Sequence, residues 1–281
     1  MRNLKRYMSG DDVWEVKNKL LELGYLSKAT HKTYGNDTFR AVKTFQQANG
    51  LEVDGITGPL TYAALFGQKP VEPVEIPGHI SPDAARVIST ALAGVSKMRQ
   101  AICLEALKWC VDPNGPHEDM RAFYIRGGNL YDQDLTAHLM TESRLNKYFK
   151  RNDYAPYYDK GREEVMRAMA ARQKYSIAGT DCSGLIVGLW RRVKVVGAGF
   201  DATADRLYGS YCVTTKSPQP GDLAWKSGHI GLYVGGYVVE AAGGAFGVQL
   251  TKDNKRTLWD YVNNRKTTQK GWSAYGDPKY Y

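Results

Sequence analysis

Residues 179–190, Gly-Thr-Asp-Cys-Ser-Gly-Leu-Ile-Val-Gly-Leu-Trp, are the most informative segment of this chain. Aspartate often caps helices, and the apolar residues after Asp181 recur at helical spacing, so the segment predicts a helix that starts at Cys182. At a helix start, the macrodipole and the free backbone N–H groups favour a thiolate and lower the pKa of a cysteine. Because the thiolate is the nucleophilic form, Cys182 is a candidate catalytic nucleophile. The alternative is a small buried hydrophobic residue, as most lone cysteines are.

Two alternating runs further along the chain predict a β-hairpin. They occupy residues 228–234 and 237–242, on either side of the tight-turn signal Gly235-Gly236. A turn centred on this pair places the apolar side chains of both strands on one face. The opposing pairs are then Ile230 with Ala241, Leu232 with Val239, and Val234 with Tyr237. The same register brings His229 and Glu240 together on the other face as a diagonal pair.

The combination of cysteine, histidine and carboxylate predicts thiol chemistry. A carboxylate beside one ring nitrogen of a histidine selects its tautomer and stabilises the imidazolium, and the other nitrogen can then hold a thiolate as an ion pair. Taken singly, His229 would be a structural histidine and Glu240 a solvated strand residue. Together with Cys182 they predict a nucleophile, an acid–base group and an orienting carboxylate. The backbone N–H of Cys182 is a candidate oxyanion donor.

These segments resemble the NlpC/P60 family of cysteine peptidases. The matching strings are Asp-Cys-Ser-Gly at 181–184, Pro-Gly-Asp-Leu at 220–223 and Gly-His-Ile-Gly-Leu-Tyr-Val-Gly at 228–235, and the tail at 271–278 resembles the ending of phage members. The resemblance covers about residues 81–281. It implies an α+β, papain-like catalytic domain in which the helix that carries the cysteine packs on an antiparallel sheet. It also implies cleavage of peptidoglycan stem peptides, typically next to γ-D-glutamate, through an acyl-enzyme.

The resemblance extends to residues around these motifs. Residues 124–128 read Tyr-Ile-Arg-Gly-Gly and resemble the Tyr-x-x-Gly-Gly element that precedes the family's cysteine. The Tyr124 hydroxyl is therefore a candidate oxyanion donor, and Asp181 and Ser183, which flank the nucleophile, are candidate substrate or oxyanion residues. Much of the family has histidine at the third polar position. Glu240 is a stronger orienting group there, but it needs hydrogen bonds of its own.

Residues 129–178 form a much longer spacer than is usual in the family, and they predict a helical insertion. Its apolar residues suggest two helices, the first with Leu135, Leu139 and Met140, and the second with Val165, Met166 and Met169. The aromatic, charged loop between them would contain Tyr148, Tyr154, Tyr157 and Tyr158. The insertion could cover the cleft and set specificity, or could only decorate the surface.

Residues 1–67 predict a separate bundle of three short helices. The first follows the candidate caps Ser9, Asp11 and Asp12 and ends at Gly24, the second covers about Asn36 to Ala48, and the third begins at Pro59. The bundle carries no titratable cluster that suggests chemistry. We therefore expect this domain to bind rather than to catalyse.

The same residues resemble a type 1 peptidoglycan-binding domain. The matching strings are Leu-Gly-Tyr at 23–25, Tyr-Gly-Asn-Asp-Thr at 34–38, Ala-Val at 41–42, Phe-Gln at 45–46 and Gly-Leu-Glu-Val-Asp-Gly-Ile-Thr-Gly-Pro at 50–59. Lys19 departs from the glutamine that the family often has. The resemblance implies that bacterial peptidoglycan is the partner. A proline-rich linker at 68–80, with Pro70, Pro73 and Pro77, leads to the catalytic domain at 81–281.

Composition excludes several classes of protein. The 281 residues are 43% hydrophobic and 24% charged, as in folded soluble proteins. No apolar run predicts a membrane span, and the start of the chain lacks the apolar core of a signal peptide. The 38 Lys and Arg against 29 acidic residues give a formal charge of +9. These basic residues are scattered, whereas a nucleic-acid binder usually concentrates them along one helix or stripe. They predict a solvated surface or attraction to a polyanion, and the charge alone does not choose between nucleic acid and an anionic cell wall. The expected partner is the wall and not nucleic acid.

No metal or other cofactor is predicted, and no oligomeric state. The four cysteines are too few for a disulfide framework, which suggests folding in a reducing cytoplasm. No HExxH or CxxC motif appears, and His31, His79, His117 and His138 are dispersed. We expect a protein that is made in the host cytoplasm without a signal peptide. It would act at the cell wall after its release, as a phage endolysin does. A tail-borne lysin or an exported autolysin would look similar.

Two other functions remain open at this level. Residues 141–146, Thr-Glu-Ser-Arg-Leu-Asn, faintly resemble the Glu-Ser element of lytic transglycosylases and lysozyme-like glycosidases, with Glu142 as the acid. No second carboxylate is clearly paired with it. The other alternative is a non-catalytic wall-binding or virion protein with an inactive peptidase fold, although no member of the Cys, His and Glu set is missing.

Overall fold

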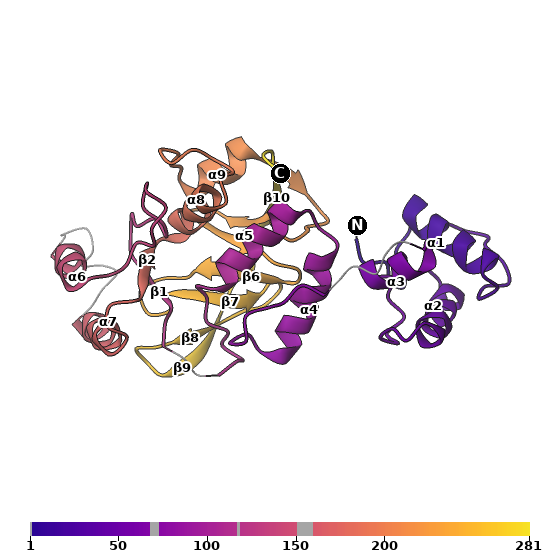
Figure 1. Cartoon of the computed structure of the whole chain (residues 1–281), viewed down its shortest axis with the longest axis horizontal. Coiled ribbons are helices and arrows are strands. Elements are labelled where there is room, and N and C mark those ends of the chain that lie inside the picture. The colour runs from indigo at the N-terminus through magenta and orange to yellow at the C-terminus, as the bar shows by residue number, and fades with distance from the viewer. Residues whose placement is uncertain (1, 68–72, 117–118, 151–159) are drawn as a thin grey trace. The chain divides into compact units, whose positions relative to one another are not determined.

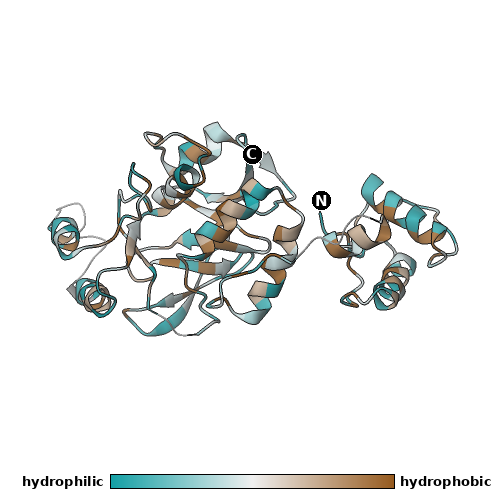
Figure 2. Cartoon of the chain, viewed as in Figure 1, coloured by the Kyte–Doolittle hydropathy of each residue, from teal (hydrophilic) through white to brown (hydrophobic). Residues whose placement is uncertain are grey.

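The computed structural model describes residues 2–67, 73–116, 119–150 and 160–281 (Figure 1). Contacts divide the chain into two units, Met1–Val74 with Ser89–Val95, and Glu75–Ile88 with Ser96–Tyr281. The chain is of mixed helix and sheet class, with a helical N-terminal unit. Its helices carry hydrophobic and hydrophilic residues in alternation along their length (Figure 2), as expected where one face is buried. Within these ranges no helix combines the length and the apolar character needed to cross a bilayer.

Residues 2–67 of the N-terminal unit contain three helices, α1 (Asp11–Glu22), α2 (Asn36–Ala48) and α3 (Pro59–Leu65). The predicted bounds of α2 and the predicted start of α3 are confirmed. The apolar faces of the helices enclose one core. Its fully buried members include Val13, Val16, Leu20, Tyr34 and Val42. Gly24 follows α1 with a φ of 78°, the left-handed conformation that glycine adopts without strain.

The predicted side-chain caps of α1 are wrong. Gly10 is the N-cap residue, and no side chain accepts a capping hydrogen bond there. Asp11 and Asp12 lie one step further on, inside the first turn, where their charge favours the helix through its dipole. Asp12 also pairs with Arg2 at 2.6 Å, so its carboxylate ties the start of the chain to the helix.

The C-terminal unit is centred on a six-stranded antiparallel sheet of order β3-β10-β4-β5-β6-β7. Its strands are β3 (Cys212–Thr215), β4 (Leu223–Lys226), β5 (His229–Tyr233), β6 (Tyr237–Ala241), β7 (Val248–Lys252) and β10 (Ala274–Pro278). The helices α5 (Lys97–Leu107), α8 (Cys182–Arg192) and α9 (Ala204–Tyr211) all contact β5. Helix α4 (Pro82–Ala93) precedes α5.

Two small sheets flank the main one. Strand β1 (Ala122–Tyr124) pairs in parallel with β2 (Ala178–Thr180), and β8 (Arg256–Asp260) pairs antiparallel with β9 (Arg265–Gln269). Strand β2 leads directly into α8, so the first small sheet positions the start of that helix.

The register of the β5–β6 hairpin is the predicted one. Leu232 lies opposite Val239, Gly231 opposite Glu240, and the Val234 N–H donates to the Tyr237 carbonyl. Gly235 and Gly236 both have positive φ values, 87° and 84°, as a tight turn of this hand requires. This register is what places His229 and Glu240 side by side.

The insertion contains two helices, but the first is not where the apolar pattern placed it. Residues 135–140 are not helical, and α6 (Glu142–Phe149) begins only after Thr141, whose side chain accepts from the Arg144 N–H as a cap. Before that cap the backbone of Leu139 bridges to Ala178 instead. Tyr148 lies within α6, whereas Tyr154, Tyr157 and Tyr158 fall outside the described residues. The second helix is confirmed as α7 (Lys160–Arg172), which carries Val165, Met166 and Met169.

Helix α8 is packed so closely at Gly184 that adding one methyl group there should lower the stability of the fold. A Cβ added at Gly184 would lie 1.9 Å from the Gly128 carbonyl oxygen. We therefore expect Gly184→Ala to lower the free energy of unfolding by roughly 1–3 kcal/mol. The matched control is Gly209→Ala in α9, where an added Cβ meets nothing within 4 Å and should be neutral or slightly stabilising. Urea denaturation measures both, and equal stabilities would contradict this packing.

Candidate functional site

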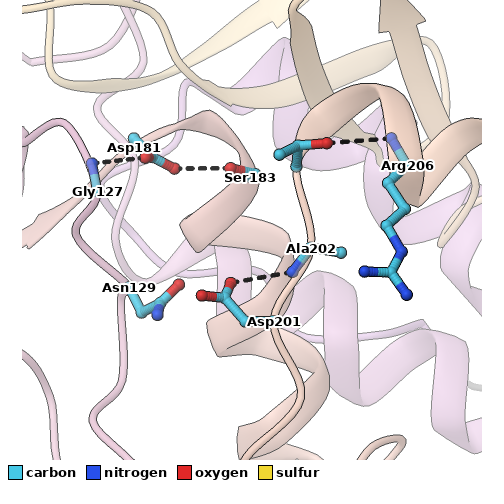
Figure 3. Close-up of a pocket in the computed structure, with 8 residues that line it drawn as sticks. Gly127, Asn129, Asp181, Ser183, Asp201, Ala202 and Arg206 are labelled. Carbon is cyan, nitrogen blue, oxygen red and sulfur yellow. Dashed lines mark hydrogen bonds between the residues drawn. The ribbon is translucent and has the colours of Figure 1, made fainter.

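Asp181 joins the start of α8 to the loop after β1. Its Oδ1 accepts from the Gly184 N–H at 2.7 Å and from the Ser183 hydroxyl at 3.0 Å, so the predicted N-cap is confirmed. Its Oδ2 accepts from the Gly127 N–H at 2.7 Å (Figure 3). The Asp181 N–H in turn donates to the Gly128 carbonyl. The carboxylate therefore accepts three hydrogen bonds, which hold the segment around Cys182 in place.

Cys182 is the first residue of α8, as predicted, but the expected lowering of its pKa is wrong. Burial, which leaves the residue 7% exposed, and the adjacent charge of Asp181 raise the pKa of the thiol to about 11. Backbone N–H groups, that of Ile230 among them, offset only part of this effect. The helix start is thus not enough to generate a thiolate, because burial and the charge of Asp181 raise the pKa more than the backbone N–H groups lower it.

The sulfur of Cys182 lies against the beginning of β5. Its Sγ is 3.9 Å from the Gly228 carbonyl oxygen and near the N–H of Ile230, the residues on either side of His229. Among the described residues, no hydrogen bond joins this sulfur to the imidazole ring. The fold therefore brings the cysteine to the strand that carries the histidine, without a direct contact in the resting state.

His229 and Glu240 form the contact that the hairpin register predicts. Nε2 of His229 lies 2.8 Å from Oε2 of Glu240. Burial alone would raise the pKa of the Glu240 carboxyl, but hydrogen bonds from Arg256 and His229 outweigh it and hold that pKa at about 2. An ionised carboxylate can only accept, so Nε2 carries the proton of this hydrogen bond, and in the neutral ring Nδ1 is left able to take a proton.

Three residues complete this carboxylate site, and none was expected to belong to it. Thr251 Oγ1 donates to Glu240 Oε1 at 2.9 Å, and Arg256 Nε donates to the same oxygen at 2.8 Å. Arg256 also contacts Oε2 and donates to the Lys270 carbonyl. The ring of Trp272 stacks on His229, with centroids 5.3 Å apart and planes 8° apart. Thr251 and Arg256 supply the hydrogen bonds that a glutamate at this position needs.

A signal for Arg256 was present in the sequence of β8. Arg256, Leu258 and Asp260 are the buried residues of that strand, and the two between them are half-buried. A charged side chain on the buried face of a strand needs a partner of opposite charge. Arg256 at such a position therefore indicates a buried ion pair. The identity of the partner could not be read, because it lies on another strand.

The other predicted residues have less direct roles. Tyr124 lies on β1, opposite Thr180, and packs against the hydrophobic cluster of the insertion. Ser183 donates to Asp181 and does not contact the imidazole. Glu142 is the exposed first residue of α6, and no described residue forms an ion pair with it. All four cysteines are free, and no group of residues in the described part of the chain is arranged to hold a metal.

Comparison with known proteins identifies the N-terminal unit. Residues 9–65 match the family described as "Putative peptidoglycan binding domain". The N-terminal unit contains a peptidoglycan-binding domain. A "Spore cortex-lytic enzyme" of Halalkalibacterium halodurans is 39% identical over 57 residues, 20% of this chain and 17% of that protein. An "Uncharacterized protein in bpoA1 3'region" of Kitasatospora aureofaciens is 41% identical over 58 residues, 20% of this chain and 49% of that protein.

These matches support a function related to the bacterial cell wall. The aligned segment spans less than half the length of either relative. No solved structure matches the chain significantly. The family of the C-terminal unit therefore rests on its own residues and geometry.

The peptidoglycan-binding domain contains a pocket. A pocket of about 420 Å³ lies between the end of α1, the end of α2 and α3. Its lining includes Lys19, Leu23, Tyr25, Phe45 and Phe66. Lys19, where the family often has glutamine, is paired with Glu22 at 2.6 Å.

Proposed function

We propose that this chain is a cell-wall hydrolase that cleaves peptidoglycan stem peptides by thiol acyl transfer. Its C-terminal unit would be a papain-like, NlpC/P60-type cysteine peptidase, and its peptidoglycan-binding domain would keep it on the wall. The observation that carries the proposal is the His229–Glu240 pair, 2.8 Å apart between β5 and β6, with the Cys182 sulfur packed against the beginning of β5. Bonds next to γ-D-glutamate are the expected targets, as in the family that the motifs resemble.

Because the pKa of Cys182 is raised, the thiol proton must be removed during the attack on the substrate. With a thiol pKa of about 11, the resting enzyme holds a neutral thiol at neutral pH. Attack on the peptide carbonyl therefore requires His229 to take the thiol proton as the carbon–sulfur bond forms. The imidazolium, held by Glu240, then gives this proton to the leaving amine as the peptide bond breaks. Water attacks the acyl-enzyme, loses its proton to His229, and the thiol is regenerated.

Three further points are consistent with this proposal. The backbone N–H of Cys182, with the Tyr124 hydroxyl as a second candidate, would stabilise the oxyanion, and one such donor contributes roughly 3 kcal/mol. The formal charge of +9 would favour encounter with an anionic cell wall. The name of the Halalkalibacterium halodurans relative, a spore cortex-lytic enzyme, also fits a wall hydrolase.

Product analysis tests the reaction class. After digestion of purified peptidoglycan by the full-length protein, we expect new amino groups and muropeptide masses that differ by hydrolysis of a stem-peptide bond. Amine labelling and mass spectrometry measure both. New reducing ends without new amines would instead indicate a glycosidase that uses Glu142. Intact peptidoglycan under conditions of wall binding would contradict a hydrolase of either kind.

A further inference from the structure

A lysine lies on the same face of the main sheet as the histidine and the glutamate of the site. Strands β4, β5 and β6 are consecutive neighbours, and Lys226 of β4 lies directly opposite His229 of β5. Directly opposite residues of an antiparallel pair project from the same face, with Cβ atoms about 5 Å apart. Glu240 contacts His229 from β6, the strand on the other side. His229 is therefore flanked by a carboxylate residue from one neighbouring strand and by a lysine from the other.

Lys226 also lies near the nucleophile. Only Ser227 and Gly228 separate it from His229 along the chain, and Sγ of Cys182 is 3.9 Å from the Gly228 carbonyl oxygen. The turn between β4 and β5 thus brings the lysine to the strand end against which the sulfur packs. The two groups lie within range of each other's charge, since an ionised Cys182 acts to raise the pKa of Lys226.

The ammonium group of Lys226 has no partner of its own. The side chain is half-buried, yet no hydrogen bond or ion pair joins it to any described residue. Burial and the charge of Arg256 lower the pKa of Lys226 below its ordinary value of 10.5, and Glu240 and Cys182 oppose this shift. Glu240 is already bonded to Arg256. Of these described neighbours, the Cys182 sulfur is therefore the one that can become anionic without being paired already.

We infer that Lys226 is a positioning residue that acts through Cys182: its ammonium group stabilises the negative charge of the sulfur when the thiol gives its proton to His229. This inference rests on the proposed thiol mechanism. Coupling between two groups is reciprocal, so if the thiolate favours the charged lysine, the charged lysine equally favours the thiolate. A cation beside a cysteine lowers the pKa of the thiol. Lys226 thus counters part of the effect of burial and of Asp181 on that pKa.

Other charged and titratable groups face this pair from the elements around it. They are Asp181 before α8, Asp205 of α9, His229 of β5, Glu240 of β6 and Arg256 of β8. Asp205 is engaged by the Trp225 ring N–H at 2.8 Å and by the Gly228 N–H at 2.9 Å. Lys226 disfavours a positive charge on His229, but Glu240 holds that charge from the opposite strand. The expected net effect of the lysine is therefore on the sulfur.

Alkylation of Cys182 in the full-length protein tests the inference without relying on hydrolysis. Iodoacetamide reacts with the thiolate, forming a carbon–sulfur bond and releasing iodide, so the rate follows the ionised fraction of the sulfur. At neutral pH we expect Lys226→Met to be labelled about tenfold more slowly than the wild type, and Lys226→Arg to stay within about threefold of it. Peptide mass spectrometry separates labelling of Cys182 from that of the other cysteines.

The pH profile separates an electrostatic effect from a steric one. The lysine is charged only below its pKa, which lies under 10.5. The difference between the wild type and Lys226→Met should therefore be full at neutral pH and disappear as the pH rises through that pKa. A methionine that only altered access to the sulfur would slow labelling by the same factor at every pH. Thiolate absorbance, taken as the difference from Cys182→Ala, provides the same comparison if the reagent does not reach the sulfur.

The matched control removes a lysine elsewhere in the same sheet. Lys252 is exposed at the end of β7, so Lys252→Met should be labelled at the wild-type rate. Equal labelling of the wild type and Lys226→Met at neutral pH, or a ratio that does not change with pH, would overturn the inference. The expected ratio in a protein that releases no amino groups from purified peptidoglycan would support the role of Lys226 and overturn the proposed function.

Discussion

Replacing Cys182 by alanine is expected to reduce the release of amino groups from purified peptidoglycan by about a thousandfold or more. The acyl-enzyme cannot form without the sulfur. Wall binding should be unchanged, because the peptidoglycan-binding domain belongs to the other unit. Amine release and cosedimentation with purified wall measure the two effects separately.

The control for this variant is a second buried cysteine outside the site. Cys212 is 8% exposed, and its sulfur donates to the carbonyl of Leu207 in α9. Cys212→Ala should keep amine release within about twofold of wild type, because it removes a thiol without touching His229 or Glu240. Amine release that survives in Cys182→Ala would rule out the thiol mechanism.

The second large effect is expected from Arg256→Met. Arg256 and Glu240 are both fully buried and form a two-point ion pair. Breaking such a pair from one side leaves an uncompensated buried charge, which costs roughly 3–5 kcal/mol. The double variant Arg256→Met/Glu240→Gln removes both charges and should recover part of that loss. A double-mutant cycle in urea gives the coupling, and additive losses would mean that the pair does not stabilise the fold.

The same variant should change how stability depends on pH. In the wild type the pKa of Glu240 is about 2 when folded, against an ordinary value of 4.5, so its contribution is present above pH 4.5 and is lost as pH falls toward 2. Without Arg256, burial dominates and raises the pKa of Glu240 in the folded state. The deficit of Arg256→Met should therefore be largest at neutral pH and narrow on acidification. A deficit that stays constant between pH 7 and 4 would contradict this ion-pair account.

Local features of this protein follow from the sequence alone. Four such features were predictable: helix α2, the start of α3 at Pro59, the N-cap at Asp181, and the hairpin register around Gly235 and Gly236. Each depends on periodicity or turn chemistry within a few residues, so the information is contiguous in the chain. The His229–Glu240 contact follows as well, because a hairpin with a known turn has only one register that buries its apolar residues.

What the tertiary structure decided is the environment of those groups. The pKa of Cys182 rises mainly because the sulfur is buried in the folded unit, and the charge of Glu240 is held by Arg256, from a strand outside the hairpin. The first insertion helix starts late because the backbone before Thr141 pairs with β2 instead. Burial and ion pairing depend on segments far apart in the chain, and the amino-acid order does not specify their approach until the whole sheet has formed.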